Sequence, residues 1–127
     1  MRIGRLTLYV AGGFRSGWQK EVHSALPEYD ILDPSAQQIR DPEEYTEWDL
    51  DAIRRSDVVL ANMEATNPGG YSLALEVGFA KALGKRIVLV DQISDPAIKR
   101  YFEMVRQSSD VVFGSLTEAI EHLNTIA

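Results

Sequence analysis

The sequence has no cysteine and only two histidines, His23 and His122, which lie far apart in the chain. The lack of cysteine excludes disulfides, thiol catalysis and zinc–thiolate sites, and two separated histidines form no metal-ligand cluster. We therefore expect a site that uses neither a metal nor a cofactor. Long apolar runs are also missing. The longest have about seven residues, against the roughly twenty of a membrane-spanning helix, so we expect no membrane contact.

Positive charge is scarce as well. Thirteen basic residues stand against nineteen acidic ones, which gives a formal net charge of -6. Such a balance repels a phosphate backbone, so polymeric nucleic acid is excluded as a partner. A single small anion held by a local site remains compatible with this charge.

What the chain does have is an ordinary globular composition: 127 residues, of which 45% are hydrophobic and 25% charged. This length and composition predict one domain that spans residues 1–127. The first five residues lead straight into a strand-like run, without the apolar core or cleavage site of a signal peptide. That beginning favours a cytoplasmic protein.

Strand-like and helix-like segments alternate along the chain. Short apolar, β-branched runs predict strands, while proline, glycine and capping residues mark helix ends. Asp41 suits a helix N-cap, Pro42 suits the first helical position, and Gly84 suits a helix stop. The predicted strands are 6–11, 29–32, 57–62, 86–90 and 111–113, and the predicted helices are 16–26, 42–56, 71–83, 96–107 and 116–126.

This alternation predicts a parallel sheet with helices on both faces. The runs 57–62 and 86–90 are almost continuously apolar, as expected for strands buried on both sides. Ligands bind such sheets beyond the carboxyl ends of the strands, where the strand order reverses. We therefore expect the chemistry in the loops 12–18, 63–70 and 91–96; the stretch 67–70, Asn-Pro-Gly-Gly, has the strongest turn composition.

Glu76 is the first candidate for a chemical role. It lies in an apolar helical segment directly after the glycine-rich loop, and no basic residue stands one turn away to pair with it. The carboxylate is therefore either on a narrow solvent-facing stripe or functional.

Other carboxylates have simpler interpretations beside the functional one. Asp49 lies in a polar, amphipathic helical segment, where a solvated acidic face is the alternative. Asp57 suits a cap between a helix and a strand. Glu64 follows a predicted strand and either reaches a pocket or is solvated.

The loop 11–18 opens a predicted helix and contains three glycines. Glycines allow close backbone approach, a helix N-terminus favours an anion, and Arg15 adds hydrogen-bond donors. The loop matches neither G-x-G-x-x-G nor the Walker pattern. Phe14 and Trp18 flank Arg15 and suit either stacking on a heterocycle or the core.

No Ser-His-Asp arrangement is supported, and no strand-end aspartate pair suggests a magnesium-dependent phosphoacceptor. A carboxylate site without metal remains. Carboxylate pairs suit glycosidic-bond chemistry, because one can attack the anomeric carbon while the other handles the leaving group.

Three segments together resemble the nucleoside 2-deoxyribosyltransferase family. The stretch TLYVAGGF at 7–14 resembles its first strand and loop. The stretch WDLDAIRRSDVVLA at 48–61 is similar to its D-L-x-x-I-x-x-x-D helix and third strand, and LEVGFAKALGK at 75–85 to its E-x-G-x-A-x-x-x-x-K nucleophile helix. The segments occur in the family's order.

The resemblance implies a doubly wound, flavodoxin-like fold with a five-stranded parallel sheet. It also implies a covalent glycosyl-enzyme mechanism on a nucleoside or nucleotide. Glu76 matches the nucleophile that attacks C1′ of the sugar, Tyr9 the tyrosine that orients it, and Asp49 the carboxylate that handles the proton of the departing base. A free base or water then captures the sugar. Such enzymes are homodimers or larger assemblies with shared sites, and the short chain also favours a pocket completed by a second subunit.

Two positions depart from the family, and one loop resembles a relative. Gly70 stands where many transferases have an aspartate that contacts the base, and the asparagine lent to a neighbouring subunit has no match at 99–102. The loop 13–17 is also similar to the phosphate loop of nucleoside 5′-monophosphate N-glycosidases. The residues expected to bind substrate are Gly12, Gly13, Phe14, Arg15, Ser16, Asn62, Gly70 and Ser72.

Three functions therefore stay open. The first is transfer of a deoxyribosyl group between bases through Glu76. The second is hydrolysis of a nucleoside 5′-monophosphate, with Arg15 on the phosphate. The third is a non-catalytic nucleotide-binding module on the same fold, because a fold alone does not fix a function.

Overall fold

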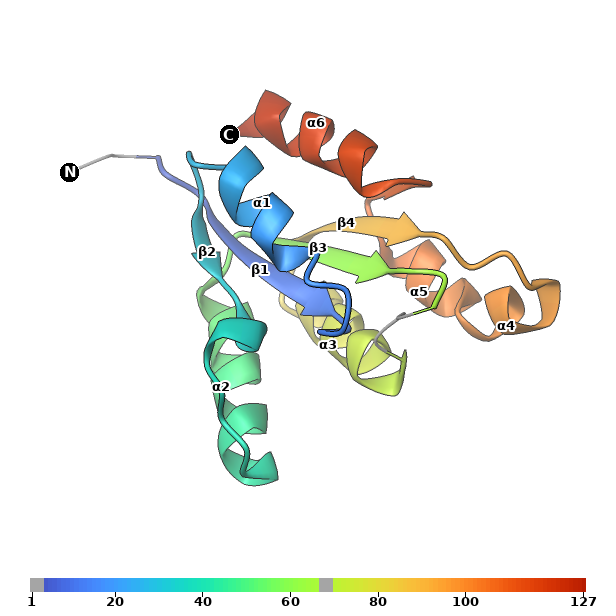
Figure 1. The fold of residues 1–127 in the computed structure, drawn as a ribbon, viewed down its shortest axis with the longest axis horizontal. Helices are drawn as coiled ribbons and strands as arrows, with labels where there is room; N and C mark the ends of the chain where they lie inside the picture. The colour runs from blue at the N-terminus through green and yellow to red at the C-terminus, as the bar shows by residue number, and fades with distance from the viewer. Residues whose placement is uncertain (1–3, 67–69) are drawn as a thin grey trace.

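The computed structural model describes residues 4–66 and 70–127. Within these residues five parallel strands form one sheet in the order β2-β1-β3-β4-β5 (Figure 1). This order is that of flavodoxin-like sheets, so the predicted doubly wound fold is confirmed. The strands are β1 (Thr7–Gly12), β2 (Asp30–Leu32), β3 (Val58–Met63), β4 (Arg86–Asp91) and β5 (Val111–Phe113).

Helices cover both faces of the sheet. They are α1 (Gln19–Ala25), the short 3-10 helix η1 (Pro34–Ala36), α2 (Pro42–Arg55), α3 (Gly70–Ala82), α4 (Pro96–Tyr101), α5 (Glu103–Ser108) and α6 (Leu116–Ile126). None of the helices described is long and apolar enough to cross a membrane.

Side chains alternate between the faces along each strand, which divides the core into two layers. Leu8 and Val10 of β1 pack with α1 and α6, whereas Tyr9 and Ala11 pack with α2, α3 and α5. Figure 1 shows α1 and α6 on one side of the sheet and α2, α3 and α5 on the other. The alternation places Tyr9 on the α2–α3 side, where the site described below is found.

The ends of several elements follow local sequence rules. The Asp41 side chain accepts a hydrogen bond from the Glu44 N–H, with Pro42 at the start of α2, as predicted. Gly84, with φ +73°, ends α3 through hydrogen bonds back to the last turn. Asp57, interpreted as a cap between a helix and a strand, accepts a hydrogen bond from the Thr7 N–H of β1 at the amino edge of the sheet.

Three features differ from the sequence prediction. Helix α1 begins at Gln19 rather than at 16, because Gly17 has φ +75° and lies outside the helical region. The helix predicted over 96–107 is two helices, α4 and α5, separated at Phe102. The helix η1 was not predicted; the Asp33 side chain caps it by accepting from the Ser35 N–H. Residues 67–69 of the predicted loop 67–70 lie outside the described residues.

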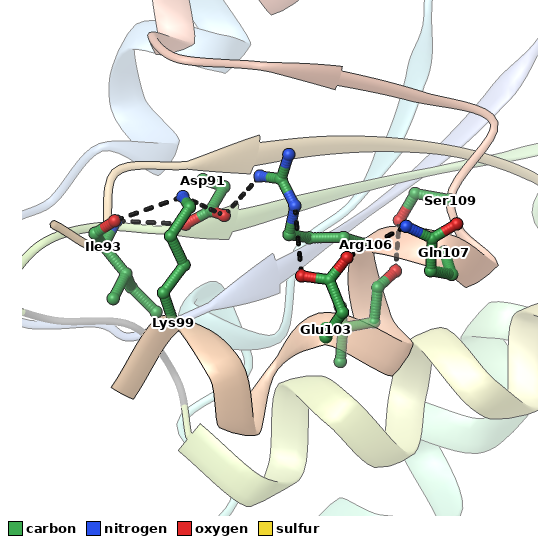
Figure 2. A network of polar contacts seen from close by, with 8 residues as sticks. Asp91, Ile93, Lys99, Glu103, Arg106, Gln107 and Ser109 are labelled. Atoms are coloured by element: carbon green, nitrogen blue, oxygen red, sulfur yellow. Dashed lines mark hydrogen bonds and ion pairs between the residues drawn. The ribbon is translucent and has the colours of Figure 1, made fainter. Parts of the chain in front are cut away.

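A network of ion pairs fixes α4 and α5 to the end of β4 (Figure 2). The Asp91 carboxylate accepts from Lys99 Nζ at 2.9 Å and from Arg106 Nη1 at 2.6 Å, and its Oδ1 accepts from the Ile93 N–H. The Asp91 side chain is buried, while both cations are partly exposed. The Asp91 carboxylate therefore anchors α4 and α5 to the end of β4.

Candidate active site

A cavity of about 370 Å³ opens at the carboxyl end of β1, beside α2 and α3. Strands β2 and β3 lie on either side of β1, so this is the point where the strand order reverses and where ligands bind sheets of this kind. The cavity is lined by Tyr9, Val10, Ala11, Gly12, Gly13, Phe14, Pro34, Gln37, Ile39, Tyr45, Asp49, Ser72 and Glu76.

Glu76 lies on the buried face of α3. Leu73, Val77 and Ala80, at helical spacing around it, are all buried, and Glu76 itself is only 8% exposed. Its carboxylate reaches the cavity and accepts a hydrogen bond from the hydroxyl of Tyr9, which is fully buried. The carboxylate therefore does not occupy a solvent-facing stripe.

Asp49 reaches the same cavity from α2 and is partly buried. It forms no hydrogen bond or ion pair with the residues that the structure describes, unlike Asp51 on the same helix, which pairs with Arg55. Asp49 contributes a negative potential at both Glu76 and Tyr9. Its carboxylate is thus available to a ligand in the cavity.

Burial changes the acidity of all three groups. It raises the pKa of Glu76 to about 7; the Tyr9 hydroxyl opposes this shift by stabilising the carboxylate, and the charge of Asp49 adds to it. Burial also raises the pKa of Asp49 to about 6. The pKa of Tyr9 is raised by burial and by Glu76, so the phenol stays a hydrogen-bond donor near neutral pH.

Arg15 and Ser16, both predicted to bind substrate, line a second cavity that adjoins the first at Phe14. Arg15 Nη2 donates to the Thr66 carbonyl at 2.6 Å, and Ser16 Oγ donates to Glu64 Oε1 at 2.7 Å. Both contacts join the β1–α1 loop to the segment that follows β3. Glu64 therefore takes part in loop contacts.

Two further predicted residues lie outside the first cavity. Gly70 begins α3 with φ +53°, and Asn62 is buried in β3 with an Oδ1 that has no partner among the residues described. Gly12 lines the cavity at a position where the backbone leaves no room for a side chain. At φ +148°, an added Cβ would lie 2.7 Å from the Asn62 carbonyl oxygen. Trp18 packs in the core beside Gly12.

The sequence interpretation missed part of the cavity wall. Pro34, Gln37 and Ile39 follow β2, a strand whose loop was not among the three expected to carry chemistry. Tyr45 lies one helical turn before Asp49, so the helical spacing contained a signal for it. The loop after β4 was expected at the site but does not line this cavity, which opens at β1, because β3 lies between β1 and β4.

No group of three or more His, Asp or Glu side chains within residues 4–66 and 70–127 is placed to hold a metal ion. The cavity brings together two carboxyl groups and a phenol, those of Asp49, Glu76 and Tyr9. A buried carboxylate with a hydrogen-bonded tyrosine can act as a nucleophile, and a nearby carboxyl of raised pKa can donate a proton.

Residues 5–93, more than half of the chain, match the family described as nucleoside 2-deoxyribosyltransferase like. The chain belongs to this family. The match contains both cavity carboxylates and Tyr9 but ends before α4. A comparison with curated proteins gave no match.

Solved structures of the same kind share the fold. A 2-desoxiribosyltransferase from Leishmania mexicana superposes with a TM-score of 0.74 at 21% identity, covering 93% of this chain and 96% of that one. A 2-deoxyribosyltransferase from Bacillus psychrosaccharolyticus has a TM-score of 0.65 at 18% identity, covering 94% of this chain and 95% of that one. The CMP N-glycosidase of Clostridium botulinum gives 0.61 at 20% identity, with coverage of 94% and 98%. These three structures share the fold of this chain, and the family match supports an enzyme of the nucleoside deoxyribosyltransferase kind.

Proposed function

We propose that this protein transfers the sugar of a deoxynucleoside from one base to another through a covalent glycosyl-Glu76 intermediate. A carboxylate oxygen of Glu76 attacks C1′, and the C1′–N bond breaks with its electron pair going to the base nitrogen. Asp49 supplies the proton that this nitrogen takes up. A nitrogen of the second base then attacks C1′, the bond to Glu76 breaks, and Asp49 accepts the proton that the incoming base loses.

The observation that supports this proposal is the position of three groups in one cavity. Glu76 is buried and accepts a hydrogen bond from Tyr9. Asp49 lines the same cavity and has no hydrogen-bond or ion-pair partner among the described residues. The Tyr9 hydroxyl stabilises the ionised form that a nucleophile needs. A solvated surface carboxylate would show neither this burial nor this partner.

The raised pKa values bear on the two roles. They are about 7 for Glu76 and about 6 for Asp49, so between those pH values the two carboxyls hold about one proton, mainly on Glu76. The productive form, with the proton on Asp49 and Glu76 ionised, is the less populated one. The hydrogen bond from Tyr9 raises its share because it stabilises the ionised Glu76.

The decisive experiment incubates the protein with a 2′-deoxynucleoside in the presence and absence of a second free base. Base exchange supports transfer, whereas release of free deoxyribose alone supports hydrolysis. Glu76→Gln is expected to lower turnover by about 10³-fold or more, because an amide is a poor nucleophile. Glu121→Gln, which removes an exposed carboxylate from α6, is the matched control.

The covalent step has its own test. A 2′-deoxy-2′-fluoro nucleoside should leave one fluorosugar on the protein, and peptide mass spectrometry should locate it on Glu76. If the protein binds nucleotides without turnover, and Glu76→Ala binds them as tightly as the wild-type protein, the non-catalytic binding module is indicated instead. Turnover by Glu76→Ala at the wild-type rate would end the assignment of the nucleophile.

A second candidate, hydrolysis of a nucleoside 5′-monophosphate, is favoured by the position of Arg15. Arg15 Nη2 donates to the Thr66 carbonyl, just after β3, and the neighbouring Phe14 lines the first cavity. A phosphate there would meet a bidentate donor. If this candidate is correct, kcat/KM is higher for monophosphates than for nucleosides. Arg15→Ala should then lower the ratio of the two values by about tenfold or more. Equal rates on both substrates would exclude it.

We further propose that the enzyme acts as a homodimer or larger homo-oligomer. Large apolar side chains are exposed on three neighbouring helices: Tyr71 and Leu75 on α3, Ile98 and Tyr101 on α4, and Met104 on α5. Such side chains are common where subunits meet. Tyr71 and Leu75 are each next to a cavity residue, Ser72 or Glu76, so a second subunit bound there would lie beside the cavity.

A further inference from the structure

Two helices divide most of the polar side chains of the first cavity between them. Helices α2 and α3 pack side by side on one face of the sheet (Figure 1). Helix α2 contributes Tyr45 and Asp49 to the cavity, and Gln37 follows η1, which packs against α2. Helix α3 contributes Glu76 and Ser72. The wall on the α3 side therefore presents the Glu76 carboxylate and one hydroxyl.

Ser72 lies one helical turn before Glu76, so the two side chains share a face of α3. Side chains of an α-helix lean toward its N-terminus, and Glu76 therefore extends along the helix in the direction of Ser72. The Ser72 hydroxyl forms no hydrogen bond with the residues that the structure describes, and the residue is exposed. The Tyr9 hydroxyl, by contrast, donates to Glu76. The Ser72 hydroxyl is thus available to a ligand whose reacting carbon lies on Glu76.

The proposed reaction determines which face of the sugar meets α3. A carboxylate that displaces the base attacks C1′ from the face opposite the bond that breaks. In a β-nucleoside the base and the 5′ carbon share one face of the sugar ring, and the 3′-hydroxyl lies on the other. With C1′ on Glu76, the base and the 5′ carbon are therefore turned away from α3. The 3′-hydroxyl is turned toward α3, where the hydroxyl that lines the cavity is that of Ser72.

We propose that Ser72 binds the 3′-hydroxyl of the sugar, so that 2′-deoxynucleosides are preferred over nucleosides that lack this hydroxyl. This inference rests on the proposed function, because it uses the attack of Glu76 on C1′ to orient the sugar. A serine hydroxyl can donate to the 3′ oxygen or accept from its hydrogen. The contact holds the ring one helical turn from the nucleophile and keeps C1′ in line with the Glu76 carboxylate. A sugar with only hydrogen at C3′ loses this contact.

The test compares a 2′-deoxynucleoside with the 2′,3′-dideoxynucleoside of the same base, in the wild-type protein and in Ser72→Ala. The substitution is expected to lower kcat/KM for the deoxynucleoside about tenfold, as the loss of one hydrogen bond does. It should leave kcat/KM for the dideoxynucleoside unchanged. The two sugars differ in intrinsic reactivity, but this difference is the same for both proteins. The ratio of the two kcat/KM values should therefore fall about tenfold in Ser72→Ala.

Further measurements separate a substrate contact from a structural effect. Alanine is favourable in helices, so Ser72→Ala should fold like the wild-type protein. Ser72→Thr retains the hydroxyl and should restore most of the ratio. Ser24→Ala removes an exposed hydroxyl from α1 outside both cavities and should preserve the ratio. If the dideoxynucleoside reacts too slowly to measure, its inhibition constant against the deoxynucleoside should be the same for Ser72→Ala and the wild-type protein.

The outcomes separate this inference from the proposed function. If no deoxynucleoside is turned over by the wild-type protein, the proposed function fails and the inference falls with it. If deoxynucleosides are turned over and Ser72→Ala lowers kcat/KM for both sugars by the same factor, or for neither, the inference fails and the function stands. A preference for a deoxynucleoside over its 5′-deoxy analogue that Ser72→Ala removes, with the 3′ ratio unchanged, would assign the hydroxyl to the 5′ end of the sugar and would also overturn the inference.

Discussion

Tyr9 controls the charge of Glu76 through one hydroxyl. The phenol is fully buried and donates to the carboxylate, which stabilises the ionised form. Burial and the charge of Asp49 act in the opposite direction and raise the pKa of Glu76 to about 7. Without the hydroxyl, only the two effects that favour the protonated form would remain.

Tyr9→Phe should therefore raise the pKa of Glu76 further. Because the nucleophile must be ionised, the acid limb of the profile of kcat/KM against pH should move to higher pH by about one unit. Base exchange measured across the pH range of the limb would show the shift. A profile that only drops in height would mean that Tyr9 does not set the acidity of Glu76.

Tyr29→Phe provides the matched control at this scale. Tyr29 is also buried and its hydroxyl donates to the Leu123 carbonyl at 2.6 Å, but it packs in the core layer of α1 and α6. The variant loses a buried hydrogen bond of similar kind far from the two carboxylates. Its acid limb should stay where it is in the wild-type protein.

At the scale of elements, the pair formed by α4 and α5 depends on one carboxylate. Burial alone would raise the pKa of Asp91, but hydrogen bonds from Lys99, Arg106 and the Ile93 N–H lower it below its ordinary value (Figure 2). A lowered pKa means that the carboxylate stabilises the fold when it is ionised. Asp91 is thus a structural residue at the carboxyl edge of the sheet.

Asp91→Asn should lower the free energy of unfolding by about 2 kcal/mol at pH 7, because two cations lose their charged acceptor. The lowered pKa gives the sign of the pH effect. The stabilisation is complete above the ordinary value of 3.8 and disappears as the pH falls through the lower value in the fold. Urea denaturation should show the full wild-type advantage at pH 7 and a smaller one at pH 3, below the ordinary value.

The control for this variant is Glu103→Gln, which weakens a more exposed contact with Arg106 at 3.8 Å. Exposed ion pairs contribute little to stability, so the free energy of unfolding of this variant should stay within about 0.5 kcal/mol of the wild-type value. The loop after β4 does not line the first cavity. A loss of base exchange by folded Asp91→Asn would therefore contradict the structural role.

How far the sequence predicts these elements depends on whether the cause is local. Asp41, Pro42 and Gly84 act on their own backbone, so the start of α2 and the end of α3 could be predicted from composition. Alternating strand and helix signals likewise predicted the parallel sheet. The break at Phe102 and the helix η1 depend on packing and on Asp33, which short-range patterns do not show.

In the candidate site, too, some residues can be predicted from the sequence and others depend on the fold. The local pattern already makes Glu76 and Asp49 candidates, whereas Tyr9 is predicted only by the resemblance; the fold places all three in one cavity. Gln37 and Ile39 have no motif, and only the fold brings them to the wall. Asn62, also expected to bind substrate, lies buried in β3, and its Oδ1 has no partner among the described residues, which the sequence does not show.

At the scale of the whole molecule, the open question is what covers the apolar side chains of α3, α4 and α5. Tyr71 is 95% and Tyr101 84% exposed, which is unusual for large aromatic residues on neighbouring helices. A second subunit on this surface would remove them from water and would lie beside the cavity. The hydrophobic gain would come mainly from aromatic and methionine side chains, which interfaces favour.

We expect the wild-type protein to sediment as a dimer or larger species at micromolar concentration. Introducing charge with Tyr101→Glu and Met104→Glu together should give monomers, because two carboxylates would have to be buried. Neither residue lines the cavity, so a loss of base exchange in these folded monomers would show that a second subunit completes the site. Leu83→Glu, one residue beyond the carboxyl end of α3, should leave the assembly intact. A wild-type monomer with full base exchange would mean that one chain forms the whole site and that this apolar surface serves no assembly.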